Sequence, residues 1–166
     1  YGALLTVAEN PVVAAVDITG NRMVPSREIM AEVEGQVGKP LNVARLSSAL
    51  DRIVERYRNK GYLLVRVDRA GMKADGSTLE IALYEGRVDS IQVEGRKKTK
   101  PSLIRREVRT RTGGPLNFDI LAQDIQHLYG LGYFESLSVD MAKGPQGGVD
   151  LTLKIREKPT AKVRLG

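Results

Sequence analysis

The chain has 166 residues, with 26 basic and 20 acidic side chains, and its formal net charge at pH 7 is +6. It contains no cysteine, which excludes disulfides and thiolate zinc sites. No apolar run approaches the roughly 20 residues that a membrane-spanning helix needs. With two phenylalanines and no tryptophan, a large aromatic ligand pocket is not expected.

The sequence repeats itself at an offset of 75 positions. A short β-like run ends at Gly20 and returns at Gly95, and the segment Gly-x-Pro-Leu-Asn ends at Asn42 and returns at Asn117. Both pairs differ by 75, since 95 − 20 and 117 − 42 agree. A repeat of this period indicates small domains in series. It points away from a single catalytic pocket.

The first unit begins with the strand-like run that ends at Gly20. A helix should follow, with Ser26 as its N-cap and Glu28 near its positive end. Asn42 should cap a second helix, whose apolar residues recur at helical spacing over four turns. These positions are Val43, Leu46, Leu50, Ile53, Val54 and Tyr57.

The same unit should end with two strands. The run 63–68 alternates as a half-buried strand does. Residues 74–77 form a turn, and a last strand with Leu79, Ile81 and Leu83 closes at Glu85. The predicted order is β-α-α-β-β.

The second unit follows the same order. Ser102 and Asn117 should cap its two helices, residues 135–140 should form the next strand, and the last strand should end at Glu157. The turn glycines Gly76 and Gly148 are only 72 positions apart, so this unit should be about one helical turn shorter near its second helix.

These patterns predict four segments. Residues 1–11, with Leu5 and Val7, read as the last strand of a preceding unit. Residues 12–86 and 87–158 are the two complete units, and residues 159–166 lead into whatever follows. Glu85, Gly86 and Arg87 form the expected interdomain joint, where the lack of a linker predicts limited bending.

The chain resembles the POTRA (polypeptide-transport-associated) domains of the BamA-type outer-membrane β-barrel assembly family. Within this family, the sequence is most similar to the cyanobacterial and chloroplast-envelope branch. The resemblance covers essentially the whole chain and includes the link between the helices, the segment 129–134 and the Glu-closed last strands. The residues of the structural motif are Gly20, Gly61, Tyr62, Gly95, Gly132, Tyr133 and Phe134.

The resemblance implies an α+β fold of tandem modules, each with a three-stranded mixed sheet covered by two helices. It implies a location at the periplasmic face of the outer membrane, or in the intermembrane space of a chloroplast envelope. Residues 159–166 would join a membrane β-barrel, and the partners would be that barrel and unfolded outer-membrane protein precursors. The resemblance specifies no accessory assembly protein.

In a sheet of order 1-3-2 the middle strand of the sequence lies at an edge, where its backbone can pair with an extended client. The client-binding residues would then be Leu63, Val65, Val67, Glu135, Leu137 and Val139. The alternative is that the charged residues of these runs protect solvated edges.

The positive charge is concentrated in the second unit. Residues 87–158 carry 13 basic and 9 acidic side chains, against 11 and 10 in residues 10–86. Arg105 and Arg109 should share a helix face, and the cluster is either a solvated face or a contact for anionic lipid headgroups. The candidate lipid contacts are Lys97, Lys98, Arg105, Arg106 and Arg109.

No catalytic set, cofactor site or metal site is expected. His127 is the only histidine, and Asp119 and Asp124, five positions apart on a helix, read as surface charges. The Gly38-Lys-Pro-Leu link resembles a nucleic-acid clamp only weakly, because Pro40 lacks a backbone donor. A nucleic-acid-binding module and a two-partner secretion transporter remain the alternative functions.

Overall fold

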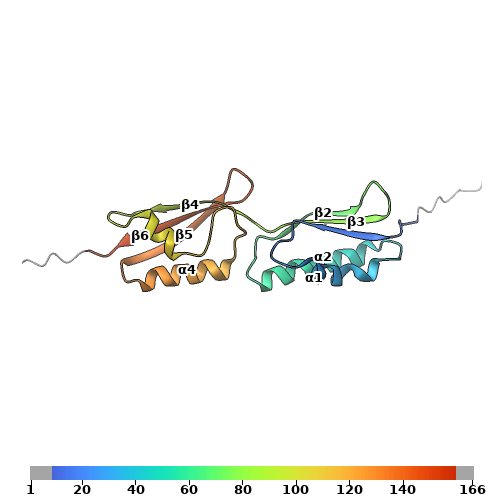
Figure 1. Cartoon of the computed structure of the whole chain (residues 1–166), viewed down its shortest axis with the longest axis horizontal. Helices are drawn as coiled ribbons and strands as arrows, with labels where there is room; N and C mark the ends of the chain where they lie inside the picture. Colours follow the sequence, from blue (N-terminus) through green and yellow to red (C-terminus); the bar gives the residue numbers. More distant parts are fainter. Residues whose placement is uncertain (1–8, 160–166) are drawn as a thin grey trace, which may run out of the picture. The chain divides into compact units, whose positions relative to one another are not determined.

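The chain is represented by a computed structural model, which describes residues 9–159 and divides into two compact units (Figure 1). Residues 9–60 and Leu64–Glu85 belong to unit 1. Gly61–Leu63 and residues 86–159 belong to unit 2. Leu5 and Val7, the residues of the expected preceding strand, lie outside the described residues, as do residues 160–166.

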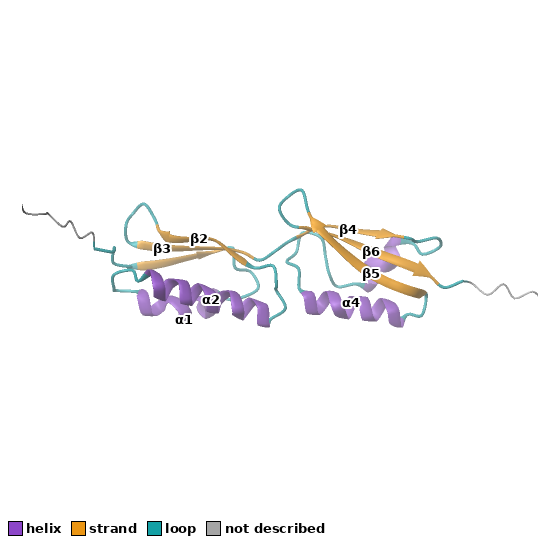
Figure 2. Cartoon of the chain, turned by 180° about the vertical axis from the view of Figure 1, so that it is seen from behind, coloured by secondary structure: helices purple, strands orange, loops and turns teal. Residues whose placement is uncertain are grey.

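Unit 1 has the predicted order of elements. Its elements are β1 Ala15–Thr19, α1 Ser26–Val33, the 3-10 turn η1 Glu34–Gln36, α2 Val43–Asn59, β2 Arg66–Met72 and β3 Thr78–Tyr84. β3 is the central strand of the sheet, with β1 parallel on one side and β2 antiparallel on the other. The two helices cover one face of this sheet (Figure 2).

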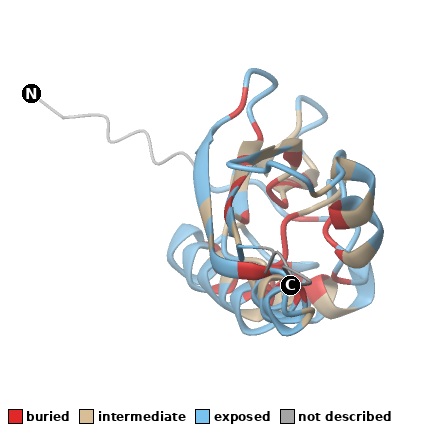
Figure 3. Ribbon diagram, turned by 90° about the vertical axis from the view of Figure 1, so that its left-hand side faces the viewer, coloured by how far each residue is buried: buried red, intermediate tan, exposed pale blue. Residues whose placement is uncertain are grey.

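The core of unit 1 lies between the sheet and the helices. The side chains of β3 alternate, so that Leu79, Ile81 and Leu83 are buried while the residues between them are half-buried. The helices contribute a stripe of buried apolar side chains that faces the sheet. Its members are Ile29, Val33, Leu46, Ala49, Ile53 and Tyr57. Buried segments occur on both strands and helices, and the outer helix faces are exposed (Figure 3).

Unit 2 repeats this architecture. Its elements are β4 Val88–Glu94, α3 Pro101–Glu107, α4 Phe118–Gly130, β5 Phe134–Lys143 and β6 Val149–Glu157. β6 is central, with β4 parallel and β5 antiparallel to it. Its core contains Ile104, Val108, Leu128, Phe134, Leu153 and Ile155. The predicted α+β fold of tandem three-stranded units is therefore confirmed.

The repeated link between the helices is tied to the start of the first strand of its unit. Gly38 N donates to Val13 O at 2.8 Å, and Val13 N donates to Lys39 O at 3.0 Å. In unit 2, Gly113 N donates to Val88 O at 2.8 Å. The backbone donors that a nucleic-acid clamp would present at Gly38 and Gly113 are thus used within the fold.

Two of the four predicted helix caps are confirmed. The side chain of Asn42 accepts a hydrogen bond from Arg45 N at 2.9 Å, and that of Asn117 accepts one from Ile120 N at 3.1 Å. The predictions for Ser26 and Ser102 are wrong, because the N-caps are Pro25 and Lys100. Proline has a φ that suits the first turn of a helix and lacks an N–H that would have no partner there, and Pro101 begins α3 without a side-chain cap.

The second helices differ in length as predicted, with 17 residues in α2 and 13 in α4. Within α2 the predicted face is only partly right. Val43, the first residue of the helix, is 66% exposed, whereas Ala49 is buried. The buried stripe therefore begins one turn later than the apolar pattern indicates.

Candidate functional site

The middle strand of each unit lies at a sheet edge. In the part of the chain that the structure describes, β2 pairs only with β3, and β5 pairs only with β6. The predicted bounds need correction, because β2 begins at Arg66 and not at Leu63. Leu63, which is 48% exposed, and Val65, which is buried, both precede the strand. β5 runs further than predicted, to Lys143.

β5 presents the longer edge. Leu137 and Val139 pack against the core of unit 2, and Ser136 and Ser138, which alternate with them, are exposed. Its register with β6 shifts only between Phe134 and Ser136 and is then regular to Lys143. Since a regular antiparallel strand directs its remaining N–H and C=O groups outward, this stretch can pair with an added strand.

The charges on the two edge strands are paired with the same or the neighbouring strand. On β5, Asp140 lies 2.5 Å from Lys154, and Glu135 lies 3.1 Å from Arg156. Both ion pairs join β5 to β6, the strand on its inner side.

On β2 the edge is less regular. A bulge interrupts the register between Val67 and Arg69, and Arg66 stacks 4.0 Å over the ring of Tyr84. Bulges and edge charges are the usual means of preventing unwanted strand pairing. Of the two predicted client sites, β5 is therefore the better formed.

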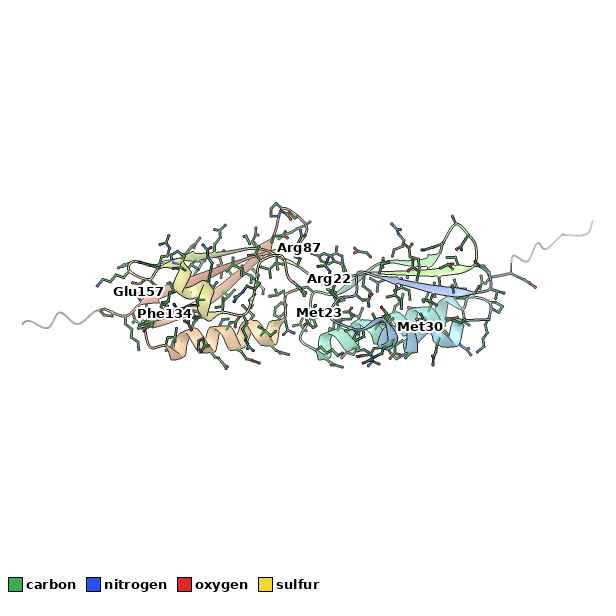
Figure 4. All side chains as sticks on the ribbon, viewed as in Figure 1. Arg22, Met23, Met30, Arg87, Phe134 and Glu157 are labelled. Carbon is green, nitrogen blue, oxygen red and sulfur yellow. The ribbon has the colours of Figure 1, made fainter. Side chains whose placement is uncertain are left out.

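The last glutamate of each unit binds the loop that follows the unit's first strand. The Glu85 carboxylate accepts hydrogen bonds from the N–H groups of Arg22 at 2.7 Å and Met23 at 2.8 Å, and from the buried Tyr57 hydroxyl at 2.8 Å. Figure 4 labels Arg22 and Met23. Glu85 is thus a structural tie within unit 1.

Glu157 repeats this tie in unit 2, where it lies at the end of β6 (Figure 4). Its carboxylate accepts from Thr99 N at 2.8 Å, from Lys97 N at 3.0 Å and from Lys98 N at 3.0 Å. The hydrogen bonds from Thr99, followed by those from Lys97 and Lys98, lower the pKa of Glu157 to about 2, although partial burial opposes them. Neither tie was foreseen from the sequence, although both glutamates ended a predicted strand.

Gly20 and Gly95 occupy equivalent turns after the first strand of each unit. Both have positive φ, +81° and +78°. A β-carbon on Gly20 would overlap the carbonyl oxygen of Leu83, and one on Gly95 would overlap that of Ile155. The turn therefore requires glycine both for its backbone angle and for the close approach of the central strand.

The remaining motif residues divide between core and surface. Gly132 ends the α4 region with φ of +78°, Phe134 is buried, and Tyr133 is 57% exposed. The Tyr133 carbonyl accepts from Lys158 N at 2.9 Å, which joins the start of β5 to the end of β6. Gly61 has φ of +88°, and Tyr62 is half-buried.

The backbone at the expected joint passes directly from one unit to the other. Glu85 is bound within unit 1, whereas Gly86 O accepts from Leu116 N at 2.9 Å and Arg87 O accepts from Val149 N at 2.8 Å in unit 2. Every residue of this segment belongs to one of the two units, with Glu85 the last residue of unit 1 and Gly86 in unit 2. The function of this segment as a joint stays a prediction.

The basic cluster does not form one helix face. Lys97 and Lys98 lie in the loop held by Glu157, and Arg105 and Arg106 are exposed on α3. α3 ends at Glu107, so Arg109 lies beyond it and the prediction that Arg105 and Arg109 share a helix face is wrong.

Arg109 is fixed by Asp124, for which the prediction of a surface charge is wrong. Asp124 is buried, and its carboxylate accepts from Arg109 N at 2.9 Å, Thr110 N at 2.8 Å and the Thr110 hydroxyl at 2.6 Å. The surface prediction failed because position 124 faces the strand-like segment after α3, whose backbone donors need an acceptor. His127 is exposed, and its Nε2 lies 3.1 Å from a carboxylate oxygen of Glu107.

Two features are absent from residues 9–159, the part of the chain that the structure describes. No group of three or more His, Cys, Asp or Glu side chains there could hold a metal ion. No helix within that range has the length and apolar character needed to cross a membrane.

Comparison with known sequences identifies the repeat. The POTRA family model, described as "Surface antigen variable number repeat", matches residues 11–86 and again residues 86–158. A putative outer membrane protein assembly factor of Treponema pallidum is 26% identical over 158 residues, which cover 91% of this chain and 19% of that protein. The outer membrane protein assembly factor BamA of Neisseria meningitidis is 25% identical over 86% of this chain. The chain spans about a fifth of the length of these relatives.

Solved structures show the same fold. The N-terminal domain of Omp85 from the cyanobacterium Thermosynechococcus elongatus has a TM-score of 0.81 and 29% identity, covering 90% of this chain and 68% of that one. Three POTRA domains of Omp85 from Anabaena give a TM-score of 0.79 at 24% identity, over 90% of this chain and 67% of that one.

Proposed function

The chain belongs to the POTRA family, and we propose that it is a periplasmic polypeptide-docking region of an outer-membrane protein assembly or translocation protein. In this proposal it captures unfolded outer-membrane protein precursors by adding their strands to its sheet edges, and it is followed by a membrane β-barrel. The names of the relatives from Treponema pallidum and Neisseria meningitidis, both assembly factors, support this context.

The observation that carries the proposal is the regular outer edge of β5. Strand addition uses backbone hydrogen bonds, so it serves many clients without reading a particular sequence. Precursors of β-barrels consist of alternating strands that fit such an edge. The side chains of Leu137 and Val139 already face the core, and an added strand could continue the same alternation.

Backbone-methylated peptides test this mechanism. The probe is a fluorescent peptide of alternating Thr and Val, about six residues long, the usual length of a strand. Two isomers carry N-methyl groups on alternate residues, one on the odd and one on the even positions. Only one set of N–H groups faces β5 in a paired strand. One isomer should therefore lose about three hydrogen bonds, at about 1 kcal/mol each, and bind about a hundred-fold more weakly. Equal binding by both isomers would contradict strand addition.

A contact between the basic cluster and anionic lipid headgroups stays a second, separate prediction. Arg105, Arg106 and Arg109 are all exposed, although Arg109 is anchored by Asp124. Vesicles containing phosphatidylglycerol should bind the chain and release it as salt increases. The triple variant Arg105→Ser, Arg106→Ser and Arg109→Ser should bind less, and unchanged binding would assign these residues to a solvated face.

A two-partner secretion transporter is the alternative within the same family. The longer second helix of unit 1, 17 residues in α2, is the feature that favours it. Client range separates the two functions. An assembly protein should bind alternating peptides of unrelated sequence with similar affinity, whereas a secretion transporter should prefer segments of one secreted partner.

A further inference from the structure

A pocket lies at the end of the unit 2 sheet where β5 begins and β6 ends. Its volume is about 760 Å³. Gly132 and Tyr133, which directly precede β5, and Lys158 and Pro159, which follow β6, contribute to its wall. Phe134 pairs with Glu157, so the start of β5 and the end of β6 lie at the same end of the sheet. The pocket thus lies at the end of the sheet at which β5 begins, beside the two residues that precede this strand.

The lining combines apolar surface with a basic rim. Leu103 of α3 and the exposed ring of Tyr133 supply apolar area. Tyr133 is held in an edge-to-face arrangement with the buried Phe134, at 6.4 Å between ring centroids. The rim has four cations, which are Lys98, Lys100, Arg106 and Lys158.

One carboxylate, that of Glu157, lines the pocket among these cations. Its oxygens accept the backbone N–H groups of Lys97, Lys98 and Thr99, so it serves the loop. Among the described residues, Lys100 and Lys158 form no ion pair. The rim therefore has an excess of positive charge, which an anionic ligand would complement.

We propose that this pocket binds an acidic polypeptide segment carrying an aromatic or aliphatic side chain, as the flank of a client strand paired with β5. A polypeptide is favoured over a lipid because the pocket is lined by the residues that precede β5, so that the flank of an extended chain paired with β5 can reach it. This inference rests on the proposed function, and it adds a sequence preference that backbone pairing alone cannot provide.

Linkage to a paired strand makes a weak contact effective. Once the strand is held on β5, its flank binds at a high effective concentration. Partly exposed charge pairs contribute little individually, but a half-buried aromatic side chain adds apolar contact. Together they should raise affinity about ten-fold over the strand alone.

The experiment uses the full chain and a set of labelled peptides. The core is the alternating Thr and Val strand described above, and an Asp-Phe-Asp flank is attached to its N-terminus in one peptide and its C-terminus in another. Matched controls carry Asn-Phe-Asn. One acidic peptide should bind about ten-fold more tightly than the core, and its Asn control should lose most of that gain. Failure of the core itself to bind would refute strand addition, whereas core binding with no gain from either flank would refute only the pocket.

Variants locate the contact. The double variant Lys100→Gln and Lys158→Gln should abolish the gain from the acidic flank and leave core binding unchanged. The control, Lys39→Gln with Arg58→Gln, removes the same amount of charge from exposed residues outside both the pocket lining and β5. Equal loss in both double variants would indicate nonspecific attraction and overturn the proposal. Tyr133→Ala should reduce the gain in affinity that the Phe of the flank provides, without changing the salt dependence of peptide binding.

Vesicles provide the competing outcome. Phosphatidylglycerol vesicles are titrated against the same lysine variants. If Lys100→Gln with Lys158→Gln weakens vesicle binding and leaves binding of the acidic peptide unchanged, the pocket is a lipid site and the proposal is wrong. The proposal expects the reverse pattern.

Discussion

Single glycines determine where the first strand of each unit turns. Gly20 and Gly95 combine positive φ with a close approach to a central-strand carbonyl, from Leu83 and Ile155 respectively. Gly76 and Gly147 also have positive φ, but a β-carbon there would meet nothing within 4 Å. Gly20 and Gly95 are therefore required both for their backbone angle and for lack of space, whereas Gly76 and Gly147 are required for their backbone angle alone.

Alanine substitution should reveal this difference. Gly76→Ala should lower the free energy of unfolding by about 1 kcal/mol, which is the strain of a non-glycine residue at positive φ. Gly20→Ala adds the overlap with the Leu83 carbonyl and should lower it by at least about 3 kcal/mol. Urea unfolding followed by circular dichroism measures both. Similar losses of unfolding free energy in the two variants would mean that β3 can move away from the new β-carbon without destabilising the fold.

The carboxylate of Glu157 should make the stability of unit 2 depend on pH. Its pKa is about 2 in the folded chain, against an ordinary value of 4.5. Because the folded pKa is lowered, the stabilisation is fully present above about pH 4.5 and is lost as the pH falls toward 2. The difference in stability between the native chain and Glu157→Gln should therefore shrink across this range and stay constant above it. Amide hydrogen exchange in β6 measures it, and a constant difference from pH 2 to 5 would contradict the assignment.

Helices and strands were predictable where pattern and chemistry agreed. The alternation of Leu79, Ile81 and Leu83 indicated a strand, and Asn42 and Asn117 preceded apolar stripes of helical spacing. The failures occurred where two signals competed. Ser26 follows Pro25, which occupies the N-cap position of α1, and Ser102 follows Pro101, the first residue of α3. Neither helix has a side-chain cap. Local sequence cannot decide between these ways of starting a helix.

The tertiary features were beyond the reach of local pattern. Asp124 resembles any surface acid until Arg109 and Thr110 are brought to it by the segment after α3. Glu85 and Glu157 bind amides of Arg22 and Thr99, which lie 63 and 58 positions away. The pocket beside Tyr133 likewise joins segments from three parts of unit 2. A repeat predicts that such ties recur, but not which atoms make them.

The contrast between cap residues gives a test at the level of one helix. The Asn117 side chain accepts hydrogen bonds from Asp119 N and Ile120 N, whereas Ser102 accepts none at the start of α3. Asn117→Ala should lower the free energy of unfolding by about 1 kcal/mol. Ser102→Ala should change it by less than about 0.5 kcal/mol. Thermal unfolding of both variants at one pH provides the comparison, and equal losses would restore Ser102 as a cap.

At the scale of the whole chain, the two units share one design but differ in charge. Unit 1 has a longer second helix and a bulged edge strand with little excess charge. Unit 2 has the regular edge, the basic loop and the pocket. If strand addition is the function, these differences predict unequal shares in client binding, with the acidic preference confined to unit 2.

The glutamate ties also predict that the units can be destabilised separately. Glu85→Gln weakens hydrogen bonds to Arg22, Met23 and Tyr57, all in unit 1, and should cost about 1 kcal/mol there. Glu157→Gln acts on the loop at Thr99 in unit 2. Hydrogen exchange with mass spectrometry at pH 7 should show faster exchange in β1 and β3 for the first variant, and in β4 and β6 for the second. Faster exchange throughout the chain in either variant would show that the units unfold as one, because each tie has its donors and acceptor within a single unit.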